Sequence, residues 1–207
     1  SAILDNQKNK VNLVQLSNLL AESVRTDSKA NEITIISSSI GLIMNWRYIL
    51  DRGIVSTKYI INDPLKSMYN DALLKLNNRL FACGASTGKI SIYNFKTSKC
   101  ILTYKIHLYV VYSMAKLSKS TLCSVSTGSA KISDFRLGLC LVTLKSRDWH
   151  YNIIKFDSKT LVIVGEGKTN IKVWNLKETT CSKEFILPST KFSLLKVGVN
   201  KIACDSS

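Results

Sequence analysis

The sequence is poor in the residues from which catalytic and metal sites are usually built. Its 207 residues contain two histidines, His107 and His150, and six cysteines, none of them in a C-x-x-C pair. Zinc sites need closely spaced His and Cys ligands, so this spacing disfavours a metal centre. We therefore expect a non-catalytic protein without a metal or cofactor.

Long apolar segments are missing as well. The longest uncharged run, Ile33 to Trp46, is shorter than the roughly 18 residues of a membrane helix, so we expect no membrane segment. The first residues, SAILDNQKNK, lack the basic-then-apolar order of a secretion signal. Half of the cysteines recur at one repeat position, which is typical of packed free thiols in a reducing compartment. The sequence thus predicts a protein of the nucleus or cytoplasm.

Acidic residues are the third shortage. Asp and Glu number 14 against 29 Lys and Arg, which gives a formal net charge of +15. Residues 63–148 hold most of this charge, with 13 basic and 4 acidic side chains. A field of this kind attracts RNA or acidic protein segments, and lysine suits phosphate attraction better than base readout. The alternative is the ordinary surface of a lysine-rich proteome.

What the sequence does contain is a repeated hairpin. Arg79 to Phe95 (RLFACGASTGKISIYNF) reads as two short strands around a polar turn in which Gly88 is free to take a positive φ. The pattern returns at Leu122 to Phe135 and Leu161 to Leu176, and more loosely at Ile33 to Trp46. In this context the glycines of the turn serve a hairpin and not a phosphate-binding loop.

The copies keep a period near 40 residues. Three sets of equivalent residues show it: the anchors Tyr93, Ser133 and Trp174, the cysteines Cys100, Cys140 and Cys181, and the lysines Lys75, Lys116, Lys155 and Lys196. Steps within each set are 39 to 41 residues. A fixed period near 40 with four short strands per repeat is typical of propeller blades.

From Ile33 onward the chain resembles a divergent WD-repeat protein. Gly167 to Asn175 (GKTNIKVWN) is the nearest match to the third strand of that family, which ends in Trp-Asp. No repeat carries the family's Gly-His pair, and the terminal Asp is Asn94, Asp134 or Asn175. The resemblance therefore implies the propeller fold, with the family's Asp-His-Ser/Thr-Trp hydrogen-bond network largely missing.

The predicted fold is all-β, a partial WD-repeat-like β-propeller of about four to five blades over residues 29–207. Clear repeats cover about 70–106, 110–147 and 151–187, here called units 1, 2 and 3, and residues 191–207 begin an incomplete one. Such an arc belongs to a longer propeller, is completed by a second chain, or closes at an unusually small size.

Residues 1–28 differ from the rest. Apolar residues at helical spacing predict a helix from Val11 to Val24, which either clasps the first blade or docks on a partner. For Ile33 to Trp46 the β-branched run at its start predicts two antiparallel strands. Asn45 to Asp51 allows another interpretation, because it faintly resembles the end of a helical F-box.

The candidate binding residues are the lysines Lys75, Lys116, Lys155 and Lys196, together with Trp149. Each lysine stands between apolar residues at the end of the strand before its hairpin, which in the resembled fold lines the central channel. An acidic segment or polyanion entering that channel would meet all four ammonium groups. Alternatively, the lysines reflect duplication alone. Trp149, expected on a loop, either caps the core between two blades or anchors an interface.

These observations predict a non-catalytic WD-repeat scaffold that binds other proteins of a multi-subunit complex. Its basic character fits a ribonucleoprotein or ribosome-maturation assembly. The alternative is the substrate-recognition subunit of a ubiquitin ligase, of the F-box/WD type. A helical segment from Val11 to Tyr59 would favour the alternative, whereas strands at Ile33 to Trp46 would favour the scaffold.

Overall fold

The computed structural model describes residues 23–24, 32–39, 42–49, 53–61, 70–166, 170–186, 192–198 and 201–206, with side chains placed at 72–145, 152–165 and 171–186. All regular secondary structure in these residues is β-strand. The described part of the chain therefore contains no helix, and so none that could cross a membrane.

The first sheet confirms the strands predicted over Ile33 to Trp46. It contains, in spatial order, β1 (Ser23–Val24), β2 (Glu32–Ser39), β3 (Leu42–Ile49) and β4 (Gly53–Ile61). Strands β2 and β3 pair antiparallel, from Glu32 opposite Ile49 to Ser39 opposite Leu42. The predicted helix from Val11 to Val24 lies outside the described residues except at its last two. Those two form β1, which pairs with β2, so a helix that extends to Val24 is wrong.

Unit 1 is a separate four-stranded antiparallel sheet. Its strands follow one another in space as they do in sequence: β5 (Asn70–Lys75), β6 (Leu80–Ala85), β7 (Lys89–Asn94) and β8 (Cys100–Lys105). Gly88, with a φ of 77°, forms the turn between β6 and β7. A Cβ atom at Gly88 would lie 2.1 Å from the carbonyl oxygen of His107, so the turn and the close approach both require glycine.

Units 2 and 3 share one six-stranded sheet because the 17-residue strand β11 belongs to both. The sheet contains β9 (Ser113–Lys116), β10 (Thr121–Asp134), β11 (Leu139–Lys155), β12 (Thr160–Glu166), β13 (Asn170–Asn175) and β14 (Thr180–Ile186). The first half of β11 pairs with β10 and its second half with β12. A two-stranded sheet of β15 (Phe192–Gly198) and β16 (Lys201–Ser206) follows.

Strand β10 corresponds to the hairpin that unit 1 builds from two strands. Gly128 lies in its middle with a φ of 73°, close to the φ of Gly88. The Phe135 N–H donates to the Ser120 carbonyl at 3.0 Å, and Phe95 donates to Arg79 in the same way in unit 1. The repeat predicted from the sequence is thus present in the backbone hydrogen bonds.

Each unit has two turns that are capped, and a different side-chain oxygen caps each turn. In the turn between the first two strands the acceptors are Asn77, Ser118 and Asp157; in the turn before the last strand they are Asn94, Asp134 and Asn175. Each accepts the backbone N–H groups two and three residues further on. Asn and Asp both offer this oxygen, which explains why either stands at the end of the third strand.

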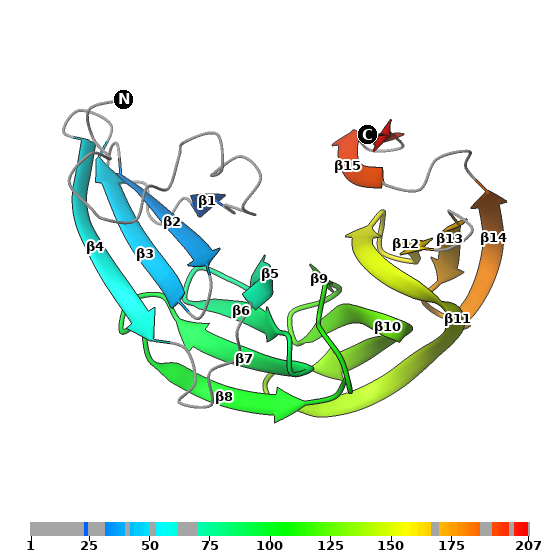
Figure 1. Ribbon diagram of the computed structural model, residues 1–207, viewed down its shortest axis with the longest axis horizontal. Helices are drawn as coiled ribbons and strands as arrows, with labels where there is room; N and C mark the ends of the chain where they lie inside the picture. The colour runs from blue at the N-terminus through cyan, green and yellow to red at the C-terminus, as the bar shows by residue number, and fades with distance from the viewer. Residues whose placement is uncertain are drawn as a thin grey trace.

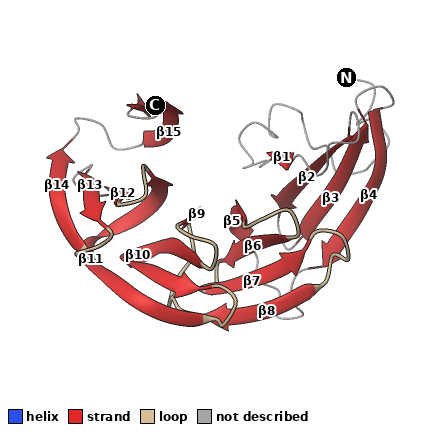
Figure 2. Ribbon diagram, turned by 180° about the vertical axis from the view of Figure 1, so that it is seen from behind, coloured by secondary structure: helices blue, strands red, loops and turns tan. Residues whose placement is uncertain are grey.

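The core lies between neighbouring units, which bury side chains against one another. One apolar cluster joins Leu74 and Ile92 of unit 1 to Leu122 of unit 2. A second joins Val125 of unit 2 to Ile163 and other residues of unit 3. The sheets consequently follow one another along an arc, with β5 and β9 toward its inside and β8 and β14 toward its outside (Figure 1). The view from behind shows the same order (Figure 2).

The recurring cysteines lie at one place in each unit. Cys100, Cys140 and Cys181 are free thiols near the start of the outermost strand, which confirms the prediction of free thiols there. They are exposed, so the expectation that they pack in the interior is wrong. They pair across the sheet with Tyr93, Ser133 and Trp174, and an irregularity in the register adjoins each pair. Cys83 and Cys123 are free and buried, and burial raises the pKa of the Cys123 thiol.

Thiol reactivity should therefore separate the cysteines by strand. In the Cys204→Ser variant, which leaves five cysteines, three thiols should react quickly with a chromogenic disulfide reagent in the native protein. All five should react after denaturation, because unfolding exposes Cys83 and Cys123. A fourth fast thiol, or fewer than five after denaturation without reductant, would contradict this arrangement.

Candidate functional site

The predicted lysines connect neighbouring units. Lys75, Lys116 and Lys155 lie at the ends of β5, β9 and β11. Strands β5 and β9 lie toward the inside of the arc (Figure 1). The Lys116 Nζ donates to the carbonyl oxygen of Leu76, which directly follows Lys75. In the same way the Lys155 Nζ donates to the carbonyl oxygen of Leu117, which directly follows Lys116.

This contact repeats from one unit to the next. Each lysine reaches back to the residue after the equivalent lysine of the preceding unit. Both half-buried ammonium groups thus bind a backbone carbonyl of the protein itself, and a hydrogen bond to a charged group contributes about 1.5–3 kcal/mol. Of the four predicted lysines, the structure gives Lys116 and Lys155 a structural role at the seams, which are the boundaries between neighbouring units. The side chain of Lys196, on β15, lies outside the described residues.

Trp149 does not lie on a loop. Its backbone is part of β11, opposite Thr127 of β10 on one side and Glu166 of β12 on the other. The expectation of a loop was wrong because β11 continues without interruption from unit 2 into unit 3. The Trp149 side chain lies outside the described residues.

A buried polar cluster at the seam of units 1 and 2 was not predicted. His107, between β8 and β9, is 2 % exposed. Its Nε2 lies 2.8 Å from the Ser124 hydroxyl oxygen and its Nδ1 lies 3.4 Å from that of Ser129. The Ser124 hydroxyl can donate to the Lys131 carbonyl at 3.5 Å, which fits a neutral ring with its proton on Nε2. Burial, reinforced by the charge of Lys131, lowers the pKa of His107 to about 4.

This cluster supplies two residue types of the network expected from the resemblance. A histidine and a serine meet in unit 2, although Ile106 precedes His107 in place of glycine. In unit 3 the buried Trp174 Nε1 has no hydrogen-bond partner. At the equivalent position of unit 2, Ser133 instead lies 3.1 Å from the Tyr104 hydroxyl of unit 1. Burial raises the pKa of Tyr104 to about 12, so this phenol stays neutral.

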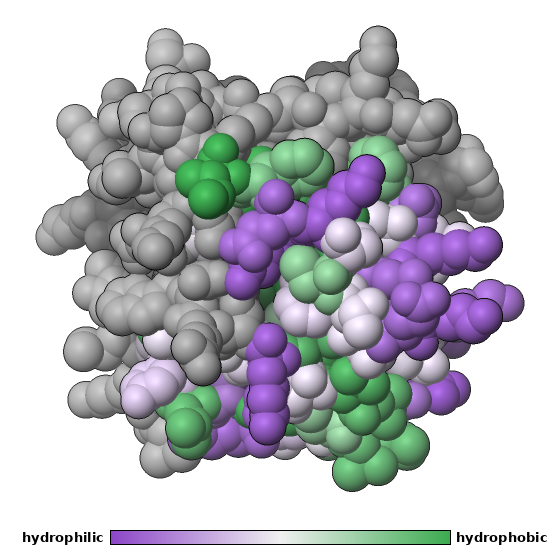
Figure 3. All heavy atoms as spheres, turned by 90° about the vertical axis from the view of Figure 1, so that its right-hand side faces the viewer, coloured by the Kyte–Doolittle hydropathy of each residue, from purple (hydrophilic) through white to green (hydrophobic). Residues whose placement is uncertain are grey.

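Basic residues dominate the surface of units 1 and 2. Within residues 72–145 there are eleven, against the single acidic residue Asp134: Lys75, Arg79, Lys89, Lys96, Lys99, Lys105, Lys116, Lys119, Lys131, Arg136 and Lys145. The Arg136 guanidinium lies 3.0 Å from Asp134 and holds the pKa of that carboxyl below its ordinary value. Hydrophilic side chains project from the face drawn in Figure 3, and hydrophobic ones gather at its lower edge.

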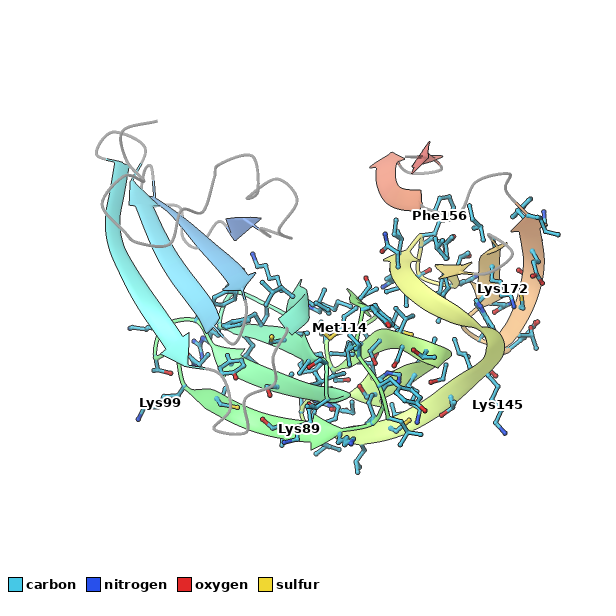
Figure 4. All side chains as sticks on the ribbon, in the orientation of Figure 1. Lys89, Lys99, Met114, Lys145, Phe156 and Lys172 are labelled. Atoms are coloured by element: carbon cyan, nitrogen blue, oxygen red, sulfur yellow. The ribbon has the colours of Figure 1, made fainter. Side chains whose placement is uncertain are left out.

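The basic side chains gather at the two ends of the strands. Arg79, Lys96, Lys99 and Lys119 lie in the turns that the side-chain oxygens cap; we call them the turn-end set. Lys89, Lys105, Lys131 and Lys145 lie toward the opposite ends of the strands; we call them the linker-end set. Lys99 and Lys145 extend outward from the arc in Figure 4.

The linker-end set brings like charges together. Lys89 and Lys105 are direct partners across β7 and β8, an arrangement that costs stability because their charges repel. In unit 2 Lys131 pairs with Thr143 and Lys145 with Ser129, so the two lysines are diagonal neighbours. An anion bound between such lysines would relieve the repulsion.

One sequence pattern associated with hydrolases lies in a turn between two strands. Gly84 to Gly88 spells G-x-S-x-G, the pattern of a hydrolase nucleophile turn, which requires a strand followed by a helix. Here the segment joins the strands β6 and β7, so it is a hairpin turn. Among the residues that the structure describes, no group of three or more His, Cys, Asp or Glu side chains could hold a metal ion.

Neither the models of known protein families nor the curated proteins match this chain. The class that the described residues define is a repetitive all-β protein of stacked antiparallel sheets. The resemblance to WD repeats rests on the period of this chain and on its segment Gly167 to Asn175, and it stays a prediction.

Replacement of a seam lysine should destabilise the protein. Lys155→Met keeps an apolar side chain and removes the ammonium group, so the Leu117 carbonyl loses this partner. We expect the free energy of unfolding to fall by about 1–3 kcal/mol. Lys159→Met is the matched control, because Lys159 is exposed in a turn and its loss should change stability by less than about 0.5 kcal/mol. Equal denaturation midpoints for the two variants would contradict the role of Lys155.

The low pKa of His107 should make stability depend on pH. The unfolded chain protonates this ring near pH 6.5, whereas the folded protein does so only near 4. The resulting stabilisation, up to about 3 kcal/mol, is complete above pH 6.5 and is lost as the pH falls toward 4. The His107→Gln variant should show a shallower decline than the wild type over this range. His150→Gln is the control, and parallel curves for wild type and His107→Gln would contradict the assignment.

Proposed function

We propose that this chain is a non-catalytic scaffold of the WD-repeat type, with residues 29–207 forming blades of a partial β-propeller. The support is the repetition of sheet, capped turn and seam contact through units 1 to 3. Further blades or a second chain would complete the ring. A stack of this kind presents turns and outer strands to partners while its sheets supply the rigid core.

The partners that we propose are proteins with acidic segments, in a multi-subunit assembly such as a ribonucleoprotein or maturing ribosomal particle. The carrying observation is the ratio of eleven basic residues to one acidic residue within 72–145. The inner lysines add less to this proposal than the sequence suggests, because Lys116 and Lys155 bind carbonyl oxygens at the seams. The outward lysines at the strand ends are better placed.

The ubiquitin-ligase alternative receives less support. It places a helical adaptor-binding segment between Val11 and Tyr59, whereas β2, β3 and β4 occupy most of residues 32–61. The F-box interpretation of Asn45 to Asp51 falls across β3, which pairs with strands on both sides. No observation on the described residues favours this function over the scaffold.

The test compares two variants of equal charge. In one, the turn-end set is changed to Gln; in the other, the linker-end set is changed to Gln. Binding of a 20-residue polyglutamate is measured by fluorescence anisotropy over a series of salt concentrations. We expect the linker-end variant to bind about tenfold more weakly than the turn-end variant and to show a smaller salt dependence. The reason is that the lysines removed in the linker-end variant are neighbours of one another in the folded protein.

Equal losses in the two variants would indicate unspecific attraction by net charge and would contradict a defined acidic-segment site. A 20-nucleotide polyuridine is measured in parallel. If the RNA binds more tightly than polyglutamate at 150 mM salt, the scaffold acts on RNA and the proposed protein partner is wrong. Denaturation curves of both variants check that the folded state is retained.

A further inference from the structure

Unit 2 exposes apolar side chains along its outermost strand. Leu137, Leu139 and Leu141 are 65 %, 56 % and 54 % exposed, and they fall within five residues of one another. Leu139 and Leu141 belong to the first half of β11, and Leu137 lies in the turn before it. Isolated exposed leucines are ordinary, but three so close together, two of them on one strand, are not.

The same positions in the neighbouring units carry other residues. When the units are aligned on Asn94, Asp134 and Asn175, the counterparts are Thr97, Lys99 and Ile101 in unit 1, and Glu178, Thr180 and Ser182 in unit 3. Five of these six are polar, and the same turn and strand form around them. The fold therefore does not need leucine at these positions.

The strand that carries the leucines is an edge. Residues Leu139 to Lys145 of β11 pair with β10 on one side, and the pairing of β11 with β12 begins only at Trp149. Along this stretch no other described strand adjoins the second side. The backbone groups of an edge strand can pair with an added strand, and proteins usually protect such edges with charged residues. Lys99 stands at the start of the outer strand in unit 1, where unit 2 has Leu139.

Positive charge borders this edge at both ends. Arg136 precedes the leucines and is exposed, while Lys145 ends the exposed stretch and Lys131 lies beside Thr143 on the adjoining strand. Asp134, the one acidic residue among the described side chains 72–145, pairs with Arg136. A strand added here would therefore gain from apolar residues that cover the leucines and from acidic residues that meet the cations.

We propose that the free edge of β11, at Leu139 to Lys145, docks an extended partner segment that carries both apolar and acidic residues. The segment adds to the sheet as a further strand, with its backbone paired to β11 and its apolar side chains on Leu139 and Leu141. This inference rests on the proposed scaffold function and names the kind of segment that it binds and the place.

The experiment selects peptides on the full-length chain from a displayed library of random 12-residue sequences. We expect enriched peptides to combine Val, Ile or Leu with Asp or Glu. The best peptide, synthesised and measured by calorimetry, should bind at least about tenfold more weakly to the Leu139→Thr/Leu141→Ser variant, which carries the residues of unit 3. Ile101→Ser removes an exposed apolar residue from unit 1 and should leave binding unchanged. Methylation of alternate backbone nitrogens in the peptide should abolish binding.

Several outcomes would overturn the inference. One is a library that yields no enriched peptide, and another is a peptide that binds wild type and the leucine variant equally. If peptide binding is unchanged in the leucine variant but is lost in the linker-end variant, the proposed scaffold function stands and the proposed docking at the edge of β11 is wrong. If the wild type self-associates in sedimentation and the leucine variant does not, the edge serves a second copy of this chain and the acidic partner is wrong.

Discussion

The structure depends on the burial of apolar residues between neighbouring sheets. A four-stranded sheet with apolar side chains on two faces is unstable alone, and it becomes stable when another sheet covers each face. The clusters that join Leu74 to Leu122, and Val125 to Ile163, provide this cover. Polar contacts then fix the alignment of neighbouring units. The bonds from Lys116 and Lys155 to backbone carbonyls do so on the inner side, and the hydrogen bond between His107 and Ser124 does so within the seam.

Much of the fold could be predicted from the sequence because its signals are local. The β-branched run at Ile33 predicted β2 and β3, and the period predicted that Cys100 and its counterparts would lie at one position of each unit. The contacts of Lys155 and His107 could not be predicted, because they join residues 38 and 17 positions apart in the sequence. Trp149 was misplaced since continuous pairing along β11 overrides a local loop pattern.

Functional interest lies where the units differ. Positions that serve the fold are filled by equivalent residues, as the capped turns show. The counterparts of Leu139 in units 1 and 3 are polar, and those of Leu141 are Ile101 and Ser182. The excess of lysine in units 1 and 2 is a second difference, because unit 3 also carries Asp157, Glu178 and Glu184. A repeat protein can specialise one unit in this way while the others maintain the scaffold.

The contacts of Lys116 and Lys155 run in one direction, from each unit to the one before it. Each unit is therefore stabilised by the unit that follows it in the sequence. The carbonyl on its inner strand gains its lysine partner only after about 40 further residues have been made. During synthesis, which proceeds from the N-terminus, each new sheet would both cover the previous one and fix it in place. The order of the repeats along the chain thus becomes an order of consolidation in time, with the most recent unit always the least secured.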